Sequence, residues 1–254
     1  MKLEHDFNIQ EYLEGCDYNT AEFLNGQSLT APVILDIEKY LTKELWVGEL
    51  GLNTQAGWLC GHAYSMWLAS LRLASSGHAA AVTPVVRAAL ESACYSLVIQ
   101  KDNSLAETWK NRHLDEASKK ASRTAFNSAV KNAAKTLNSL NGFGDKVNRL
   151  YESCIDFGAH PNPLSIAHNI HREYLTESTW NNHIGILYNL DQIQAKRGLL
   201  FCTDVGVTIA YICTEILDAT DLHRQRLAGL LLSVHAAVEA FNKEASAAQN
   251  GNQG

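Results

Sequence analysis

Residues 84–99 are the segment that most limits what this chain can fold into. When they are placed at the 100° intervals of an α-helix, apolar side chains point to nearly every side as far as Ile99. Such a helix must be covered by other elements, because its apolar faces cannot all lie in water. Thr83 and Pro84 suit the N-cap and the first helical position. The segment therefore predicts a central helix that begins at Pro84.

Helical periodicity, with apolar residues at spacings of three and four, also covers most of the remaining chain. Runs of Val, Ile and Thr that alternate with polar residues are nearly absent. Gly77 is expected to cap a helix in the left-handed conformation. The predicted helices cover about 31–45, 54–76, 84–99, 104–139 (as one helix or two), 145–158, 190–219 and 221–245.

Between residues 164 and 189 neither the helical nor the strand pattern dominates. Residues 166–174 alternate enough for a short strand, and residues 184–188 could be its partner. The sequence thus predicts an all-α fold, a multi-helix bundle that can include a short β-hairpin near residues 164–189.

No linker divides the 254 residues, so a single domain is expected. We place this helical domain at residues 31–246. Residues 1–30 are polar with scattered aromatic side chains, and we expect a loosely packed lead-in there. Residues 247–254 are expected to be a disordered tail.

Targeting and membrane signals favour a cytoplasmic protein that does not enter a membrane. Residues 1–7 contain acids where a secretory signal has a basic start and an apolar run. The most apolar stretch, residues 198–217, contains Asp204 near its middle and Glu215 near its end, so we interpret it as a buried core helix. The six cysteines have no metal-ligand spacing and are expected to be free, buried thiols.

Arg87 and Glu91 are the most informative charged residues. Their i, i+4 spacing aligns them on one helical face within apolar surroundings, so we expect them to be buried together. Buried charges need partners, and Asp204, a charge within another apolar helix, is the expected partner of Arg87. Asp156 and His160, also four residues apart, are the next candidates. These residues form either a structural polar cluster or a ligand-binding or catalytic pocket.

His160 lies in a segment whose backbone is restricted, because Gly158 precedes it and Pro161 and Pro163 follow. Its ring could titrate near neutral pH or simply donate a hydrogen bond to a carbonyl group. His168 and His171 lie nearby, but their spacing matches no standard metal site, and no metal or other cofactor is expected.

Arg72 and His78 have the Arg-x5-His spacing that helical ribonucleases of the HEPN class use to hold phosphate and act near the scissile bond. Leu73 stands where that class usually has a polar residue. This pair supports an alternative function, a metal-independent ribonuclease that uses Arg72 and His78, or Arg87 and His160.

Residues 110–149 are basic, with nine Lys and Arg residues against three acids, whereas the whole chain has a formal charge of −6. A basic helical face can follow a phosphate backbone, although it can also be an ordinary solvated surface. The candidate RNA-binding residues are Lys120, Arg123, Lys131 and Lys135.

Three stretches carry a resemblance to a known group of proteins: Val-Val-Arg-Ala-Ala-Leu-Glu-Ser-Ala-Cys-Tyr at 85–95, Trp109 with Arg112, and Tyr151 followed by Ile-Asp-Phe-Gly-Ala-His-Pro-Asn at 155–162. Together they resemble uncharacterised bacterial all-helical proteins with a remote HEPN-like character. The resemblance implies an all-α bacterial cytosolic protein. It marks Arg87, Glu91 and His160 as important without assigning them a role.

The function favoured by the sequence is a non-catalytic interaction or sensing module with a polar centre made by the Arg87, Glu91, Asp156, His160 and Asp204 side chains. A homodimer through the two C-terminal helices is a further expectation, because their apolar face is broader than one core needs. That face consists of Leu227, Leu230, Leu231, Val234 and Val238.

Overall fold

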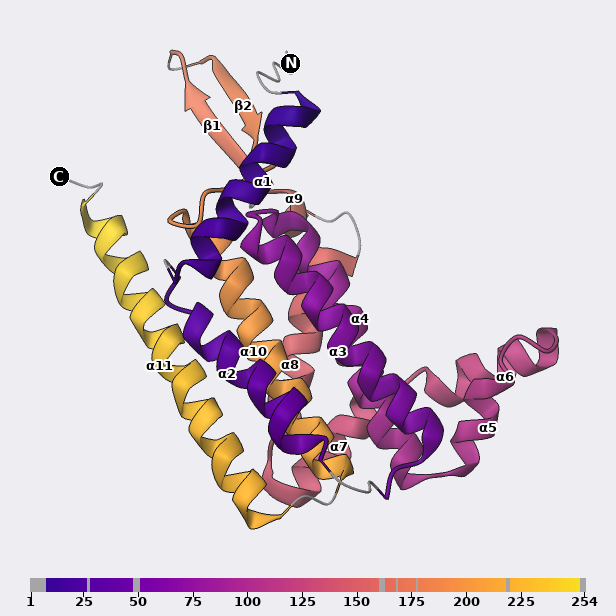
Figure 1. Cartoon of the computed structure of the whole chain (residues 1–254). Helices are drawn as coiled ribbons and strands as arrows, with labels where there is room; N and C mark the ends of the chain where they lie inside the picture. Colours follow the sequence, from indigo (N-terminus) through magenta and orange to yellow (C-terminus); the bar gives the residue numbers. More distant parts are fainter. Residues whose placement is uncertain are drawn as a thin grey trace.

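The computed structural model describes residues 8–26, 28–47, 51–159, 163–167, 169–176, 178–217 and 220–251. Over these residues the fold is all-α with one two-stranded antiparallel hairpin, as the sequence predicts (Figure 1). The first elements are α1 (Ile9–Leu24), α2 (Ala31–Lys39), the π-helical turn η1 (Tyr40–Leu45), α3 (Thr54–Ser75), α4 (Ala79–Lys101), α5 (Ser104–Lys110), α6 (Glu116–Phe126) and α7 (Ala129–Asn141). The remaining ones are α8 (Gly144–Cys154), the π-helical turn η2 (Ile155–Ala159), α9 (Pro163–Ala167), β1 (Ile170–Tyr174), β2 (Trp180–Ile184), α10 (Ile193–Ile216) and α11 (Asp221–Gly251).

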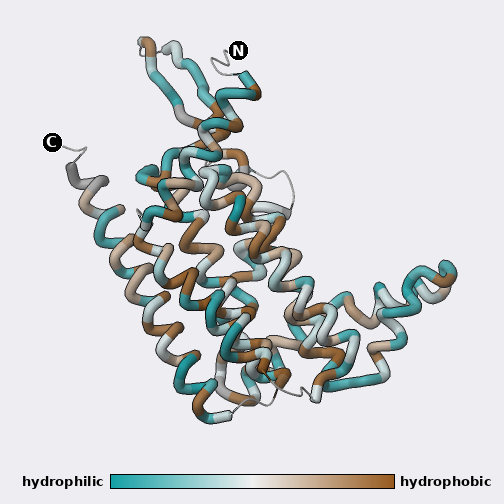
Figure 2. Tube along the Cα trace, viewed as in Figure 1, coloured by the Kyte–Doolittle hydropathy of each residue, from teal (hydrophilic) through white to brown (hydrophobic). Residues whose placement is uncertain are grey.

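The core forms around α4 and α10, which have buried side chains on most of their faces. Helices α2, α3, α4 and α11 all contact α10, and Figure 2 shows hydrophobic residues concentrated along these helices. Trp67 of α3 is fully buried, and its indole N–H donates to the Cys202 carbonyl oxygen of α10 at 2.9 Å. A Cβ atom at Gly206 would lie 2.6 Å from the Trp67 ring, so only glycine lets these two helices approach this closely.

The central helix begins earlier than the sequence predicts. α4 starts at Ala79, so Pro84 lies inside the helix and Thr83 is not its N-cap. The Thr83 hydroxyl instead donates to the Phe157 carbonyl oxygen at 3.0 Å and links α4 to η2. The Gly77 prediction is confirmed, with a φ of 86° between α3 and α4.

The N-terminal region differs from the loosely packed lead-in expected for residues 1–30, because residues 9–24 form α1. Asn8 caps this helix, and Asn19 on it is buried. The Asn19 amide donates to the Ser76 and Tyr188 carbonyl oxygens, both at 3.0 Å. One polar side chain thereby joins α1, the turn between α3 and α4, and the segment before α10.

The hairpin is present, but its second strand comes earlier than expected. Ile170 pairs with Ile184 and Tyr174 pairs with Trp180, so β2 ends where the predicted partner strand begins. The stretch predicted as one or two helices at 104–139 contains three, because turns at 111–115 and 127–128 separate α5, α6 and α7. Figure 1 shows α5 and α6 extending away from the helices that form the core.

The C-terminal helix is longer than the sequence predicts, and part of its apolar face lies in the core. α11 continues to Gly251, so most of the predicted tail at 247–254 is helical, and residues 252–254 lie outside the described part. Leu227, Leu230 and Val234 are buried within this single chain, where α11 contacts α2 and α10. The apolar face that suggested a homodimer is therefore largely filled by the chain's own core, and the homodimer stays a prediction.

Helices α4 and α10 are long and apolar enough to cross a membrane by length and composition alone. Most residues in the apolar window of each helix are buried inside the protein, more completely in α10 than in α4. Core helices of soluble proteins meet the same criteria. The six cysteines are free and buried, as predicted.

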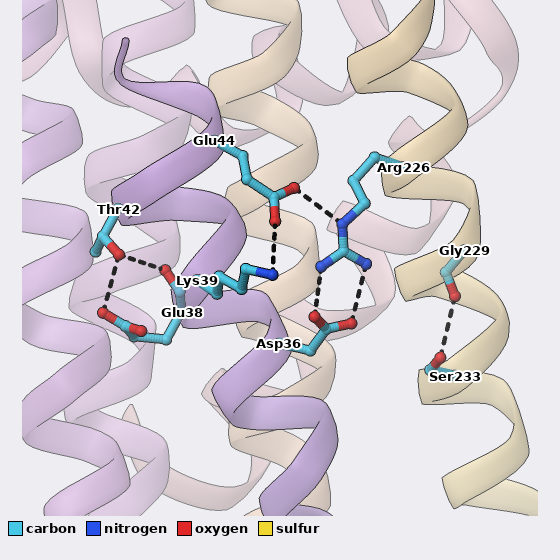
Figure 3. Close-up of polar contacts among 8 residues, drawn as sticks. All are labelled: Asp36, Glu38, Lys39, Thr42, Glu44, Arg226, Gly229 and Ser233. Carbon is cyan, nitrogen blue, oxygen red and sulfur yellow. Dashed lines mark hydrogen bonds and ion pairs between the residues drawn. The ribbon is translucent and has the colours of Figure 1, made fainter.

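Arg226 fixes α11 to α2 and η1 (Figure 3). Its guanidinium group donates two hydrogen bonds to the Asp36 carboxylate, one of them at 2.9 Å, and its Nε donates to Glu44 at 2.9 Å. The hydrogen bonds from Arg226 hold the pKa of Asp36 below its usual value. Lys39 lies 3.8 Å from Glu44 at the edge of this group. We call Arg226, Asp36 and Glu44 the Arg226 clamp.

Replacing Arg226 by Gln should lower the free energy of unfolding by about 1 to 2 kcal/mol, because charge-assisted hydrogen bonds are lost but solvent screens a partly exposed pair. Asp36 has a lowered pKa in the folded chain, so the stabilisation by Arg226 is complete above about pH 4 and is lost as the pH falls through the lowered pKa. Urea unfolding at neutral and acid pH measures both effects. Lys39→Gln is the control and should change little; equal stability of Arg226→Gln and wild type would contradict the role of the clamp.

Candidate functional site

Arg87, Glu91 and Tyr151 form a closed hydrogen-bonded group between α4 and α8, which we call the Arg87 cluster. The Arg87 Nε donates to the Glu91 Oε1 at 2.9 Å, and another guanidinium nitrogen donates to the Tyr151 hydroxyl oxygen at 3.1 Å. The Tyr151 hydroxyl in turn donates to Glu91 at 3.0 Å. The Arg87 guanidinium also lies over the Tyr151 ring, 5.3 Å from its centroid, within the range of a cation–π contact.

The electrostatics of the Arg87 cluster favour the charged pair and a neutral tyrosine. Burial alone would lower the pKa of Arg87, but Glu91 and Tyr151 outweigh it, and the pKa is raised. Burial and the nearby Glu91 charge raise the pKa of Tyr151, so its hydroxyl keeps the proton that it donates to Glu91. Burial also raises the pKa of the neighbouring Cys154 thiol to about 12. The cluster is thus a stable ion pair beside an unreactive thiol.

The prediction that Arg87 and Glu91 are sealed in the core is wrong. Their side chains are 28% and 32% exposed, so they are half-buried at the edge of the α4–α8 contact. Asp204 is not the partner of Arg87, since it forms an ion pair with Lys146 of α8. A neutral tyrosine from α8 takes the position for which the sequence suggested a distant carboxylate.

The remaining members of the predicted polar centre are Asp156 and His160. Asp156 lies exposed on η2. His160 lies outside the described residues, as does His168, and the side chain of His171 is also outside them. Within the part of the chain that the structure describes, no three His, Cys, Asp or Glu side chains are grouped to hold a metal ion.

Arg72 and His78 lie at the same end of α3 but engage different partners. The Arg72 guanidinium is exposed and donates to Asp17 at 2.9 Å and to Thr20 at 2.7 Å, both on α1. His78 is half-buried with its ring edge against Tyr12, and burial lowers its pKa. In the described structure no hydrogen bond or ion pair joins Arg72 to His78, so their spacing in sequence does not produce a joint site.

The basic residues Lys120, Arg123, Lys131 and Lys135 are exposed, as an RNA-binding face requires. They do not share one continuous helix, because α6 ends at Phe126 and α7 begins at Ala129. None of the four forms an ion pair within the described residues. α6 follows the end of α4 that lies opposite Arg72 and His78, and α4 itself has 23 residues and is about 35 Å long.

A cavity of about 430 Å³ lies beside the first turns of α4, where α10, α11 and η2 meet. This volume falls in the range of small-molecule sites. Its lining is mainly apolar and comes from segments far apart in sequence. Prominent lining residues are Phe157 of η2, Phe201 of α10, and Val238 and Phe241 of α11.

Two charged residues of α10 also line the cavity, Arg197 and Asp204. They are seven residues apart and lie on one face of the helix, about 10.5 Å from each other along its axis. The sequence predicts a functional role for Asp204 but not for Arg197. The only signal there is a basic pair, Lys196 and Arg197, directly before the apolar run that starts at Gly198.

No protein-family model, curated protein or solved structure gives a significant match to this chain. The resemblance of residues 85–95 and 151–162 to bacterial helical proteins with HEPN-like character therefore stays a prediction. The geometry of the cavity and of the Arg87 cluster is the basis for the functional proposal that follows.

Removing the Tyr151 hydroxyl by Tyr151→Phe should lower the free energy of unfolding by about 1 kcal/mol, because Glu91 loses a donor and Arg87 loses an acceptor. Arg87 and Glu91 remain paired on α4, so the fold should be retained. Urea unfolding provides the measurement. Tyr18→Phe, at an exposed position on α1, is the control and should be neutral. If the two variants have the same stability, the Arg87 cluster does not connect α8 to α4.

Proposed function

We propose that this protein is a non-catalytic binding module that takes a small, mainly apolar molecule into the cavity between α4, η2, α10 and α11. The observation that carries the proposal is the cavity itself, about 430 Å³ in volume and lined mainly by apolar side chains. A lining of this kind is typical of ligand sites, in which a few polar groups fix the orientation. Binding within a helical assembly would suit the sensing role that the sequence favours.

The polar groups of the lining support binding rather than catalysis. The Thr83 hydroxyl donates to the Phe157 carbonyl oxygen, and the Ser153 hydroxyl donates to the Arg149 carbonyl oxygen at 3.0 Å. Within the described residues neither hydroxyl is hydrogen-bonded to a general base, which an activated nucleophile requires. The third chemically active group, the Asp204 carboxylate, forms an ion pair with Lys146.

The position of the cavity also supports a sensing role. Its wall includes Phe157, one residue of the stretch that resembles bacterial helical proteins, and Thr83, which is hydrogen-bonded to Phe157. A bound molecule would therefore contact the junction of η2 and α4. The Arg87 cluster lies farther along α4, where it would hold α4 and α8 together.

RNA binding through α6 and α7 is a second candidate, supported by the four exposed basic residues Lys120, Arg123, Lys131 and Lys135. A ribonuclease has less support, because Arg72 is engaged by α1 and His78 is half-buried against Tyr12. These two residues also lie at the end of α4 opposite α6. The main proposal, which rests on the cavity, is therefore better supported than RNA binding or ribonuclease activity.

The proposal is tested with anilinonaphthalene sulfonate, a probe that fluoresces in apolar surroundings. Wild-type protein should bind the probe at a saturable site. Val238→Trp places an indole in the cavity and should weaken binding about tenfold or more, because the space for the probe is filled. Fluorescence titration measures the affinity.

Leu232→Trp is the matched control, since Leu232 lies on the same helix but is 71% exposed and outside the cavity lining. It should bind the probe as wild type does. Ala80→Phe, which enters the cavity from α4, should reproduce the loss caused by Val238→Trp. If both cavity-filling variants retain native circular dichroism and bind the probe normally, the cavity is not the binding site.

A further inference from the structure

We infer that the cavity selects an amphipathic molecule with one negative charge, such as a medium-chain carboxylate, whose anionic head pairs with Arg197. This inference rests on the proposed function and adds the chemical class of the ligand. It follows from the placement of charge along the face of α10 that lines the cavity.

Arg197 is a lining residue with its charge available. Its side chain is exposed, and within the described residues it forms no ion pair. Arg72, Arg87 and Arg226, in contrast, are each held by a carboxylate. A guanidinium group presents several N–H donors in one plane and matches a carboxylate with two hydrogen bonds. Arg197 can therefore receive an anionic head without first releasing a carboxylate partner of its own.

Apolar side chains continue from Arg197 along the same face of α10. Leu200 and Phe201 lie three and four residues beyond it, so they are its neighbours on the helix surface. Val238 and Phe241 of α11 complete this part of the lining. A molecule whose head pairs with Arg197 would thus place its body against an apolar surface.

Asp204 limits the ligand to a single negative charge. It lines the cavity two helical turns beyond Arg197, and it carries the opposite sign. Its pairing with Lys146 reduces its field, and among the described lining residues no Lys or Arg other than Arg197 is present to bind a second anion. The cavity thus has a cationic end and an end that disfavours anions, which orients an amphipathic anion in one direction.

The test compares decanoate with decanol, which share an apolar chain and differ in the charge of the head. Isothermal titration calorimetry on the full chain should show decanoate binding at least about tenfold more tightly than decanol, because its carboxylate gains charge-assisted hydrogen bonds. Arg197→Gln should remove most of this difference, because it should weaken decanoate binding far more than decanol binding. Added salt should weaken only decanoate binding.

Arg149→Gln is the control for charge, because Arg149 is exposed on α8 and outside the cavity lining. It should bind both compounds as wild type does. Equal binding of decanoate and decanol, with no effect of Arg197→Gln, would overturn the inference. If Val238→Trp and Ala80→Phe still removed the binding of both compounds, the proposed function would stand. If neither compound binds, or if binding survives both of these substitutions in folded protein, the proposed function fails as well.

Discussion

The apolar character of α10 is the constraint on which the rest of this structure depends. Its buried side chains point to most sides of the helix, so neighbouring elements must cover it along its length. Helices α3 and α4 cover one part of its surface, and α2 and α11 cover another. The cavity lies where this cover is incomplete, along the first half of α10. There the helix presents Arg197 and Asp204 beside apolar side chains.

α11 contributes to both the core and the cavity. Near its start the Arg226 clamp fixes it to α2 and η1, and Leu227, Leu230 and Val234 then pack into the core. About 18 Å along the helix from Arg226, Val238 and the following Phe241 form a wall of the cavity. The Arg226 clamp is thus separate from the surface that would contact a ligand, whereas the second half of α11 is joined to α10 by the ion pair of Glu244 with Lys196.

The sequence predicts much of the fold because helical periodicity reports directly on burial. It identifies α4 and α10 as core helices, and the structure confirms both. It misplaces the start of α4, because Pro84 suits a first turn but is also accommodated inside the helix. It misses α1, which is attached through residues distant in sequence: the buried Asn19 amide donates to two carbonyl oxygens, and Arg72 of α3 donates to Asp17 and Thr20.

The candidate site is harder to predict, because spacing along one helix does not reveal which element covers a side chain. Arg87 and Glu91 do share a face of α4, yet Tyr151 and solvent surround them instead of a sealed core. Asp204 lies in an apolar run, but it reaches Lys146 and the cavity rather than Arg87. The cavity is assembled from α4, η2, α10 and α11, so no local pattern in the sequence identifies it.

The central claim, that the second half of α11 forms the wall of a ligand site, is tested most directly by hydrogen–deuterium exchange of the full chain with and without decanoate. Ligand contacts should slow amide exchange in residues 238–245 and in the first turns of α4 and α10, because bound ligand suppresses local opening. Exchange in α6 should be unchanged. Saturating decanoate that leaves residues 238–245 unprotected, or protects only segments outside the cavity lining, would contradict the account.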